Sequence, residues 1–257
     1  MLIEQPKKFI EFCKITQIEK LGSYVEIKLS SERILKSIKP GQFLNVKLNS
    51  VFFRRPFTLF RKEKNIISIL VKIVGKGTKE LSNMKEGQEI EVLGPLGNSI
   101  LDFGILEESE VDLVAGGVGI ANMITVGELF KKNNKKVRLF WGIRTKEEYF
   151  EKYFEYFDDI YISSEDGSVG EKGLVTQVLE KKYTGNKIYT CGPIPMIRSI
   201  SQLRDIKAED VICSLETVMG CGIGICYGCN IGNQQYGYLL ICKDGPNFRL
   251  SEIEKLL

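Results

Sequence analysis

The chain has 257 residues, with 36 basic and 33 acidic side chains, seven cysteines and no histidine. The missing histidine excludes a Ser-His-Asp or Cys-His catalytic pair, and any His-ligated zinc, haem or Rieske centre, within this chain. The net charge of +3 is too small to indicate nucleic acid or an anionic membrane as a partner. Because no acid–base histidine is present, any difficult chemistry is expected to belong to a cofactor.

The N-terminal sequence and the hydropathy predict a cytoplasmic protein. The first residues, MLIEQPKKFIEF, contain an early Glu and Pro and no apolar stretch, so they do not predict a secretory signal. No apolar run reaches the ~18 residues that a membrane span needs. In a reducing compartment, clustered cysteines are metal ligands or redox groups more often than disulfides.

Residues 1–100 are predicted to form a small β-barrel domain. Six or so short runs rich in Val, Ile and Leu are separated by turn signals, with no long helical pattern between them. The clearest runs are SYVEIKL (23–29), FLNVKL (43–48), IISILVKI (66–73) and EIEVLG (89–94).

Two stretches of this segment suit the phosphates and ring of a flavin nucleotide. In RRPFT (54–58), an arginine can hold a phosphate with two hydrogen bonds, and the Thr58 hydroxyl can bond to an isoalloxazine edge. In GKGT (75–78), backbone N–H groups ahead of a possible helix can face a pyrophosphate. Taken alone, neither stretch specifies a flavin site, and the first is more often a solvated loop.

Residues 101–208 alternate strand and helix patterns, which predicts a parallel α/β domain. The glycines Gly116, Gly117 and Gly119 follow a short apolar strand, as in a dinucleotide-binding loop, although Asn122 stands at the third glycine position. Cys191, Gly192 and Pro193 follow a later strand and are expected at the ligand-binding edge of the sheet. The predicted strands are 111–115, 137–145, 159–164 and 187–193, and the predicted helices are 121–136, 146–157 and 173–183.

Residues 209–257 are rich in Gly and Cys and are predicted to form a small module that needs a metal to fold. Cys221, Cys226, Cys229 and Cys242 follow the spacing C-x4-C-x2-C-x12-C, and the first three positions match the plant-type [2Fe–2S] pattern. A four-cysteine zinc site is the alternative, although zinc sites more often have two paired knuckles. The other cysteines, Cys13, Cys191 and Cys213, are predicted to be small apolar fillers.

In chain order, the motifs KPGQF (39–43), RRPFT (54–58), GPLG (94–97), GGVG (116–119) and CGP (191–193) resemble the ferredoxin–NADP⁺ reductase superfamily. The C-terminal runs SLE (214–216), MGCGIGICYGC (219–229) and CKDGPNF (242–248) make the chain similar to the electron-transfer subunits of type B dihydroorotate dehydrogenases. This resemblance covers nearly the whole chain. It implies a multidomain β and α/β fold with an FAD-binding barrel, an NAD-binding domain and a [2Fe–2S] module.

The resemblance also implies which residues bind the cofactors, and it implies no catalytic acid or base. Two departures from the family pattern are Thr58, which replaces the usual Ser, and Asn122, which lies where a Pro-containing turn is common. The implied FAD contacts are Arg55, Pro56, Phe57, Thr58, Leu70, Val71, Lys72, Gly77 and Thr78; the candidate NAD contacts are Gly116, Gly117, Gly119, Cys191, Gly192 and Pro193; and the cluster ligands are Cys221, Cys226, Cys229 and Cys242.

The family implies an electron relay in pyrimidine (UMP) biosynthesis. A separate FMN-containing dihydroorotate dehydrogenase subunit oxidises dihydroorotate, and electrons pass through [2Fe–2S] and FAD to NAD⁺, in a heterotetramer of two plus two subunits. NAD is expected even though Arg144, after the second α/β strand, suits a 2′-phosphate. Met219, Ile223, Ile225 and Tyr227 are candidates either to contact the partner or to shield the cluster.

Two other functions fit parts of the sequence. One is an FAD/[2Fe–2S] subunit of another NAD(P)H oxidoreductase, such as a sulfhydrogenase or a bifurcating NADH–ferredoxin reductase; Cys221 disfavours the bifurcating enzyme, in which the first ligand is typically not Cys. The other is a non-enzymatic, zinc-stabilised binding module, which stoichiometric FAD would exclude. Neither nucleic acid nor a membrane is an expected partner.

Overall fold

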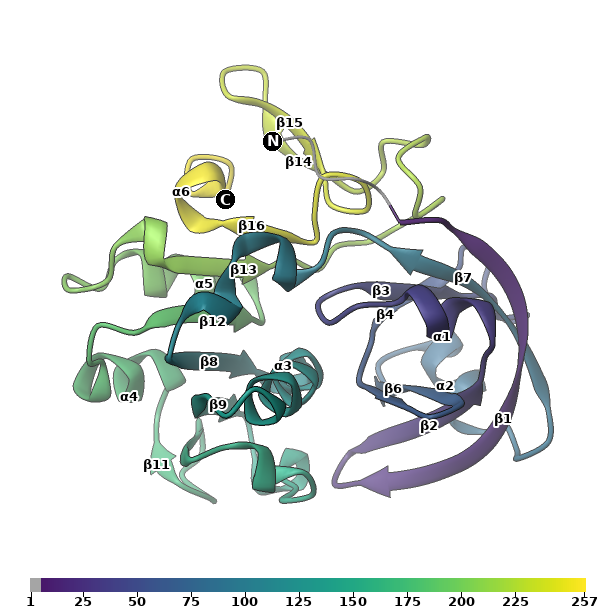
Figure 1. Ribbon diagram of the computed structural model, residues 1–257, viewed down its shortest axis with the longest axis horizontal. Coiled ribbons are helices and arrows are strands. Elements are labelled where there is room, and N and C mark those ends of the chain that lie inside the picture. Colours follow the sequence, from purple (N-terminus) through teal and green to yellow (C-terminus); the bar gives the residue numbers. More distant parts are fainter. Residues whose placement is uncertain (1–5) are drawn as a thin grey trace.

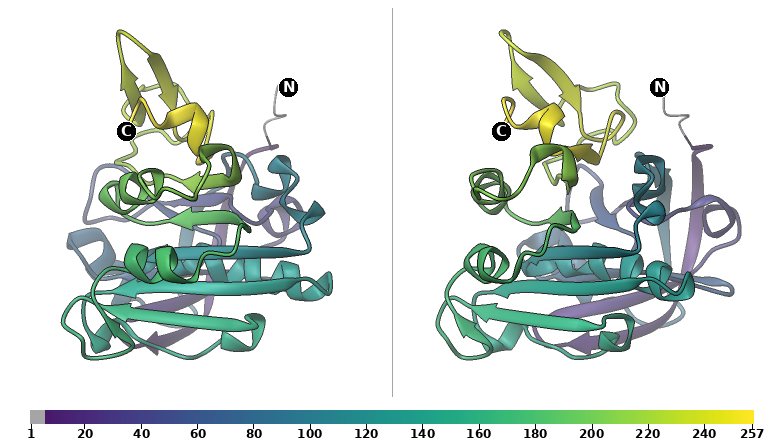
Figure 2. Two further views of the ribbon diagram at one scale, coloured as in Figure 1. Left: turned by 90° about the vertical axis from the view of Figure 1, so that its left-hand side faces the viewer. Right: turned by 60° about the vertical axis from the view of Figure 1, so that its left-hand side comes forward.

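Two seven-stranded sheets and a two-stranded hairpin organise residues 6–257, the part of the chain that the computed structural model describes. The two sheets lie side by side, and the hairpin projects from one end of the molecule (Figures 1 and 2). The first five residues, on which the expectation of no secretory signal partly rests, lie outside the described residues. Within 6–257, no helix is long and apolar enough to cross a membrane.

The N-terminal sheet is wholly antiparallel and curls into the expected barrel. Its strands, in sheet order, are β4 (Arg55–Thr58), β3 (Phe43–Val46), β7 (Glu89–Leu96), β1 (Phe9–Leu21), β2 (Tyr24–Ser30), β6 (Ile66–Lys72) and β5 (Arg61–Glu63), with helices α1 (Arg33–Ser37) and α2 (Lys76–Ser82) between strands. The edge strands β4 and β5 follow each other directly in the chain, so this connection joins the two sides of the barrel. Alternating side chains of β1 and β2, such as Ile15 and Ile27, fill its core.

The central sheet confirms the predicted parallel α/β domain, and one antiparallel strand is added at its edge. In sheet order it contains β11 (Glu171–Lys172), β10 (Asp159–Ser164), β9 (Lys136–Ile143), β8 (Glu110–Gly116), β12 (Lys187–Cys191), β13 (Val211–Ser214) and β16 (Asn247–Arg249). The α-helices that follow its strands are α3 (Ile120–Lys132), α4 (Val175–Lys182) and α5 (Ile194–Ser201), and α6 (Leu250–Ile253) follows β16.

The C-terminal segment shares this sheet instead of forming a separate body. Strands β13 and β16 both lie within 209–257, so a boundary between residues 208 and 209 cuts the central sheet. What projects from the sheet is the cysteine loop and the hairpin β14 (Asn230–Asn233) and β15 (Gly237–Leu240).

The predicted helix over 146–157 is wrong. The segment contains only the 3₁₀ turns η4 (Lys146–Glu148) and η5 (Phe154–Tyr156), and Tyr153 has a left-handed φ of 77° that interrupts a helix. The aromatic rings leave the helical path to surround the buried indole of Trp141, with the Phe150 ring centroid 5.1 Å away. Tertiary packing of aromatic side chains therefore overrides the local helical pattern.

A buried ion pair ties β8 to β9. Two nitrogens of Arg138 donate to the Asp112 carboxylate at 2.7 and 2.6 Å, and Asp112 is 0% exposed. Replacing Asp112 with Ala is expected to destabilise the protein by roughly 3–5 kcal/mol, because it leaves a buried guanidinium without its main partner. Urea unfolding followed by the fluorescence of the single tryptophan, Trp141, measures this loss.

The matched control is Glu110→Ala, which removes a more exposed carboxylate 3.7 Å from the same guanidinium. We expect this control to cost less than about 1 kcal/mol, as for other partly exposed ion pairs. Equal losses in the two variants would contradict the assigned importance of the Asp112 pair.

Candidate flavin, dinucleotide and cluster sites

A cavity of about 650 Å³ opens on the barrel side of the junction between the two sheets. Strand β4 lines it with all four of its residues, which are also four of the predicted FAD contacts. Leu70, Lys72 and Thr78 line it as well. Their convergence from β4, β6 and α2 forms a pocket of the size and composition that a flavin needs.

Two predicted FAD contacts lie behind this wall. The side chain of Val71 points to the opposite face of β6 and packs in the barrel core. Gly77 is buried, and a Cβ there would lie 3.5 Å from Cγ of Arg55 and 3.1 Å from Leu48. The tight neighbour is thus Leu48, whereas the contact with Arg55 would be an ordinary one, and neither Val71 nor Gly77 lines the cavity with a side chain.

A second cavity, of about 560 Å³, lies at the carboxyl ends of the central strands. Gly116, Gly117, Gly192 and Pro193 line it, as expected for a dinucleotide site at this edge of an open α/β sheet. The other two candidate NAD contacts, Gly119 and Cys191, do not line this cavity. They pack against each other, since a Cβ on Gly119 would lie 2.1 Å from the carbonyl oxygen of Cys191. Gly119 thus permits close packing of the loop on β12, and Cys191 is 1% exposed.

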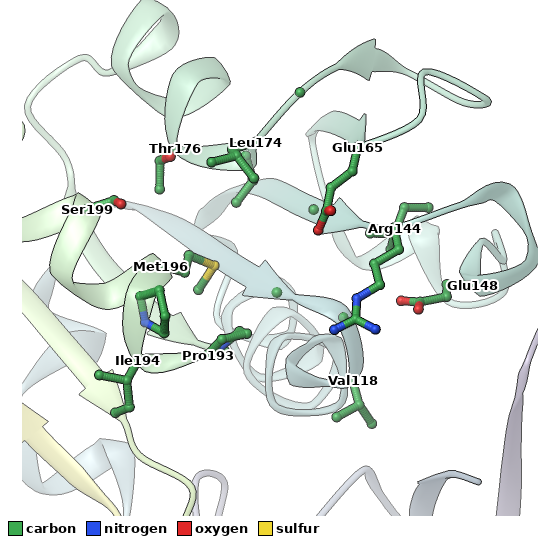
Figure 3. Close-up of a pocket in the computed structure, with 18 of the residues that line it drawn as sticks. Val118, Arg144, Glu148, Glu165, Leu174, Thr176, Pro193, Ile194, Met196 and Ser199 are labelled. Carbon is green, nitrogen blue, oxygen red and sulfur yellow. The ribbon is translucent and has the colours of Figure 1, made fainter. Parts of the chain in front are cut away.

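Charged side chains gather on one side of the second cavity. Figure 3 shows Arg144, Glu148 and Glu165 together there, with Pro193, Ile194 and Met196 on the other side. Glu165 directly follows β10, the strand that lies beside β9 in the central sheet. Glu148 is bound from the barrel, since it accepts hydrogen bonds from Lys72 Nζ at 2.6 Å and from the Tyr24 hydroxyl at 3.0 Å.

The two cavities meet, because Lys72, Val118 and Glu216 line both of them. Glu216 is exposed toward the two cavities that it lines. Desolvation by the surrounding protein atoms still raises the pKa of Glu216, and the Cys191 thiol, 3.9 Å from Oε1, offsets only part of that rise. A carboxyl that keeps its proton could donate a hydrogen bond to a group bound at the border between the two cavities.

Asn122 connects the barrel to the floor of this border. The Thr58 hydroxyl donates to Oδ1 of Asn122 at 2.6 Å, while Nδ2 of Asn122 donates to Cys191 Sγ at 3.3 Å and to Ser214 Oγ at 3.1 Å. Burial raises the pKa of the Cys191 thiol, which therefore stays neutral. Asn122, which departs from the glycine-loop pattern, thus fixes the position of the Thr58 hydroxyl, the group predicted to form a hydrogen bond with the flavin ring.

The cysteine loop directs backbone N–H groups at sulfur atoms. The amides of Ile223, Ile225 and Cys226 donate to Cys221 Sγ at 3.3–3.4 Å, and the Gly224 amide donates to Cys242 Sγ at 3.1 Å. Burial opposes ionisation of Cys221, but these donors outweigh it and lower its pKa to about 6. Such N–H···S bonds stabilise the negative charge on sulfur and influence the potential of an iron–sulfur cluster.

The four sulfurs form two pairs. Cys221 and Cys226 exchange N–H···S bonds at 3.4 Å, and Cys229 Sγ lies 3.2 Å from Cys242 Sγ. Among residues 6–257, no group of three or more such side chains is arranged around a single metal ion. Two thiolate pairs match a [2Fe–2S] cluster, in which each iron takes two protein ligands, so the residues fit this group.

One thiol pair lies at the surface, next to the candidate partner contacts. Cys226 is exposed, whereas Cys229 and Cys242 are buried. Met219 is 4% exposed, lies in the hydrophobic core and lines the flavin cavity, which favours shielding within this chain over contact with a partner. Ile225 and Tyr227, in contrast, are exposed beside the Cys226 thiol.

The fold and these sites define a flavin- and NAD-dependent oxidoreductase of the ferredoxin reductase type, with an added iron–sulfur module. Family models match along the chain: the oxidoreductase FAD-binding domain at 12–100, the oxidoreductase NAD-binding domain at 113–202, and the iron–sulfur cluster binding domain of dihydroorotate dehydrogenase B at 216–254. These matches confirm FAD, NAD and the cluster as cofactors, so the zinc alternative and the non-enzymatic binding module are not supported.

Relatives identify the family. The dihydroorotate dehydrogenase B (NAD⁺) electron transfer subunit of Fusobacterium nucleatum subsp. nucleatum is 34% identical over 95% of this chain and 98% of its own length. The protein of the same name from Caldanaerobacter subterraneus subsp. tengcongensis is 38% identical over 85% of this chain and 88% of its own length. The chain belongs to the family of dihydroorotate dehydrogenase B (NAD⁺) electron transfer subunits.

Solved structures support the fold. The structure of an NADH-dependent reduced ferredoxin–NADP oxidoreductase, described for flavin-based electron bifurcation, has a TM-score of 0.80 and 28% identity, covering 94% of this chain and 89% of that one. The ferredoxin–NADP⁺ reductase from Plasmodium falciparum has a TM-score of 0.66 at 14% identity, covering 82% of this chain and 96% of that one, and shows the fold alone.

Proposed function

We propose that this chain carries electrons from a dihydroorotate dehydrogenase catalytic subunit that contains FMN to NAD⁺. When bound, the cluster supplies single-electron transfer, and FAD links it to two-electron hydride transfer with the nicotinamide. One observation carries the proposal: Met219 and Pro246, which lie next to the cysteine loop in the chain, line the same flavin cavity that adjoins the dinucleotide cavity at Glu216. The three cofactor sites are therefore contiguous.

The residues have distinct roles in this proposal. In the flavin site, the Arg55 guanidinium would bind the pyrophosphate, and the Thr58 hydroxyl, held by Asn122, would form a hydrogen bond with the flavin ring. The glycine loop and the turn at Gly192 receive the dinucleotide. The proposed contacts are Arg55, Pro56, Phe57, Thr58, Leu70, Lys72 and Thr78 for FAD, Gly116, Gly117, Gly192 and Pro193 for NAD, and Cys221, Cys226, Cys229 and Cys242 for the cluster.

The catalytic subunit is proposed to bind where the cysteine loop reaches the surface. We call this surface the cluster face; its exposed apolar residues are Phe52, Phe53, Val218, Ile223, Ile225 and Tyr227. A Cβ on Gly220 would lie 3.1 Å from Cys226 Sγ and 3.6 Å from the Phe53 ring, so the barrel loop and the cysteine loop share this face. Adjacent exposed apolar side chains are typical of a protein interface.

Reconstitution tests the proposal. The chain and a candidate FMN-containing subunit are co-expressed and purified, the mass of the complex is measured, and dihydroorotate-dependent reduction of NAD⁺ is assayed. We expect a complex of two plus two subunits whose NAD⁺ reduction requires this chain. Equal NAD⁺ reduction by the catalytic subunit alone, or failure of the two chains to associate, would contradict the proposal.

We also propose that the protein is cytoplasmic, because the reducing cytoplasm keeps cysteines available as thiolate ligands of the cluster.

The side chain of Glu165 is proposed to favour NAD over NADP. A carboxylate at the end of β10 can accept a hydrogen bond from a ribose hydroxyl, but it repels a 2′-phosphate. Replacing Glu165 with Gln is expected to raise kcat/KM for NADPH relative to NADH by about tenfold, the equivalent of about 1.4 kcal/mol. Steady-state oxidation of the two nucleotides with an artificial acceptor measures this ratio.

Arg144→Gln is the control for the Glu165 variant. Arg144 lines the same cavity with the opposite charge, so its loss is expected to lower the NADPH to NADH ratio or leave it unchanged. A rise of the ratio in the Arg144 variant, or no change in the Glu165 variant, would show that the carboxylate does not select the ribose.

A further inference from the structure

Asn45 on β3 is a buried amide without a hydrogen-bond partner. Its side chain is 0% exposed, and among residues 6–257 neither Oδ1 nor Nδ2 has a partner. Since burying an unpaired amide is costly, native proteins rarely tolerate one without a reason. Asn45 does not line the flavin cavity, so the flavin does not supply the missing partner.

The amide points at the cysteine loop. A Cβ built on Gly222 would lie 2.6 Å from Nδ2 of Asn45, and 3.3 Å from the Leu96 side chain beside it. Gly222 is buried, has a left-handed φ of 73°, and directly follows the ligand Cys221 in the chain. Glycine at this position thus lets the loop approach the buried amide of the barrel more closely than any side chain would allow.

We propose that Nδ2 of Asn45 donates a hydrogen bond to a sulfur atom of the [2Fe–2S] cluster on its Cys221 side and so raises the reduction potential of the cluster. This inference rests on the proposed ligation by Cys221. The backbone donors to Cys221 come from the cysteine loop itself, whereas Asn45 comes from the barrel. Donors to cluster sulfur favour the reduced cluster because it carries more negative charge.

The position of Asn45 also links the two redox sites. Asn45 is paired with Pro56 of β4, the strand that walls the flavin cavity. The same two-strand unit therefore contributes to the flavin site through β4 and to the cluster through β3. In this arrangement the barrel domain, and not only the cysteine loop, influences the difference in reduction potential between the cluster and the flavin.

Asn45→Leu tests the inference, because leucine has a similar shape and no donor. In the purified complex, we expect iron and FAD contents to match wild type, while the reduced-to-oxidised ratio of the cluster at a fixed ambient potential falls about tenfold. For one electron, that ratio corresponds to a shift of about 59 mV toward negative potential. Redox titration followed by the EPR signal of the reduced cluster measures it.

Ser68→Ala is the matched control, since Ser68 is another buried polar side chain of the barrel without a partner among the described residues. Its cluster potential is expected to equal that of wild type. An unchanged potential in a fully loaded Asn45→Leu protein overturns the role of Asn45. If wild type and variant both bind no cluster, the proposed function itself fails, so the two failures are distinguishable.

A measurement that retains Asn45 covers the case in which the leucine variant does not assemble. Protein labelled with ¹⁵N in asparagine side chains is reduced and examined by pulsed EPR. The label is combined with Asn230→Ser, because the Asn230 amide also lies at the loop and donates to the Tyr227 carbonyl. A ¹⁵N coupling to the reduced cluster is expected, and its absence overturns the inference.

Discussion

Replacing Cys226 with Ala is expected to abolish electron transfer between the catalytic subunit and NAD⁺ while leaving the oxidation of NADH by artificial flavin acceptors near the wild-type rate. The substitution removes one of the two sulfurs of the surface pair, so the cluster would lose one of its four proposed ligands. Cys226 is exposed and does not line the flavin or dinucleotide cavity, so FAD and NAD binding should persist. Visible absorption, iron content and the two assays in the reconstituted complex measure the separation.

Cys13→Ala is the control for this loss. Cys13 is a buried thiol in the barrel core, and its truncation is expected to cost about 1 kcal/mol of stability with the cluster retained. Loss of NADH oxidation in the Cys226 variant would instead indicate that the cysteine loop holds the flavin domain together. Retention of a full cluster would exclude Cys226 as a ligand.

The four cysteines proposed as cluster ligands could be picked out from the sequence because the pattern that marks them is local. Three of them lie within nine residues, and the spacing alone specifies a loop whose amides face sulfur. Most strands of both sheets were also predictable from short apolar runs. The 13-residue strand β1 was missed, because charged and polar residues interrupt its apolar residues along the whole strand. The helix expected over 146–157 failed because packing around Trp141, and not local periodicity, decides that segment.

The side chains that complete the sites were harder to predict, because the fold brings them together from distant positions. Thr58 and Asn122 are 64 positions apart in the chain, and their hydrogen bond depends on how the barrel docks on the central sheet. Glu216 could have been found from its place in the SLE run, but only the structure puts it between both cavities. Asn45 has no sequence signal of its own; it is identified by an amide without a partner.

Glu216→Ala is expected to slow the reduction of FAD by NADH by about a hundredfold. The carboxyl lies on the shared border of the two cavities, where it can hold the nicotinamide against the flavin, and hydride transfer depends steeply on that alignment. Glu216→Gln keeps the shape and a donor, so it should recover most of the rate. Anaerobic stopped-flow absorbance of the flavin measures it, with Glu180→Gln on α4 as an unaffected control.

The pH dependence separates a positioning role of Glu216 from simple packing. Because its surroundings raise the pKa of Glu216, the carboxyl keeps its proton, and with it a hydrogen-bond donor, to a higher pH than an ordinary glutamate and loses both as the pH rises through that raised pKa. The wild-type rate of FAD reduction should therefore decrease as the pH increases through the pKa of Glu216. The Gln variant cannot ionise, so its rate should show no such decrease. An identical decline in both proteins would mean that a different group titrates and that Glu216 does not position the nicotinamide through its proton.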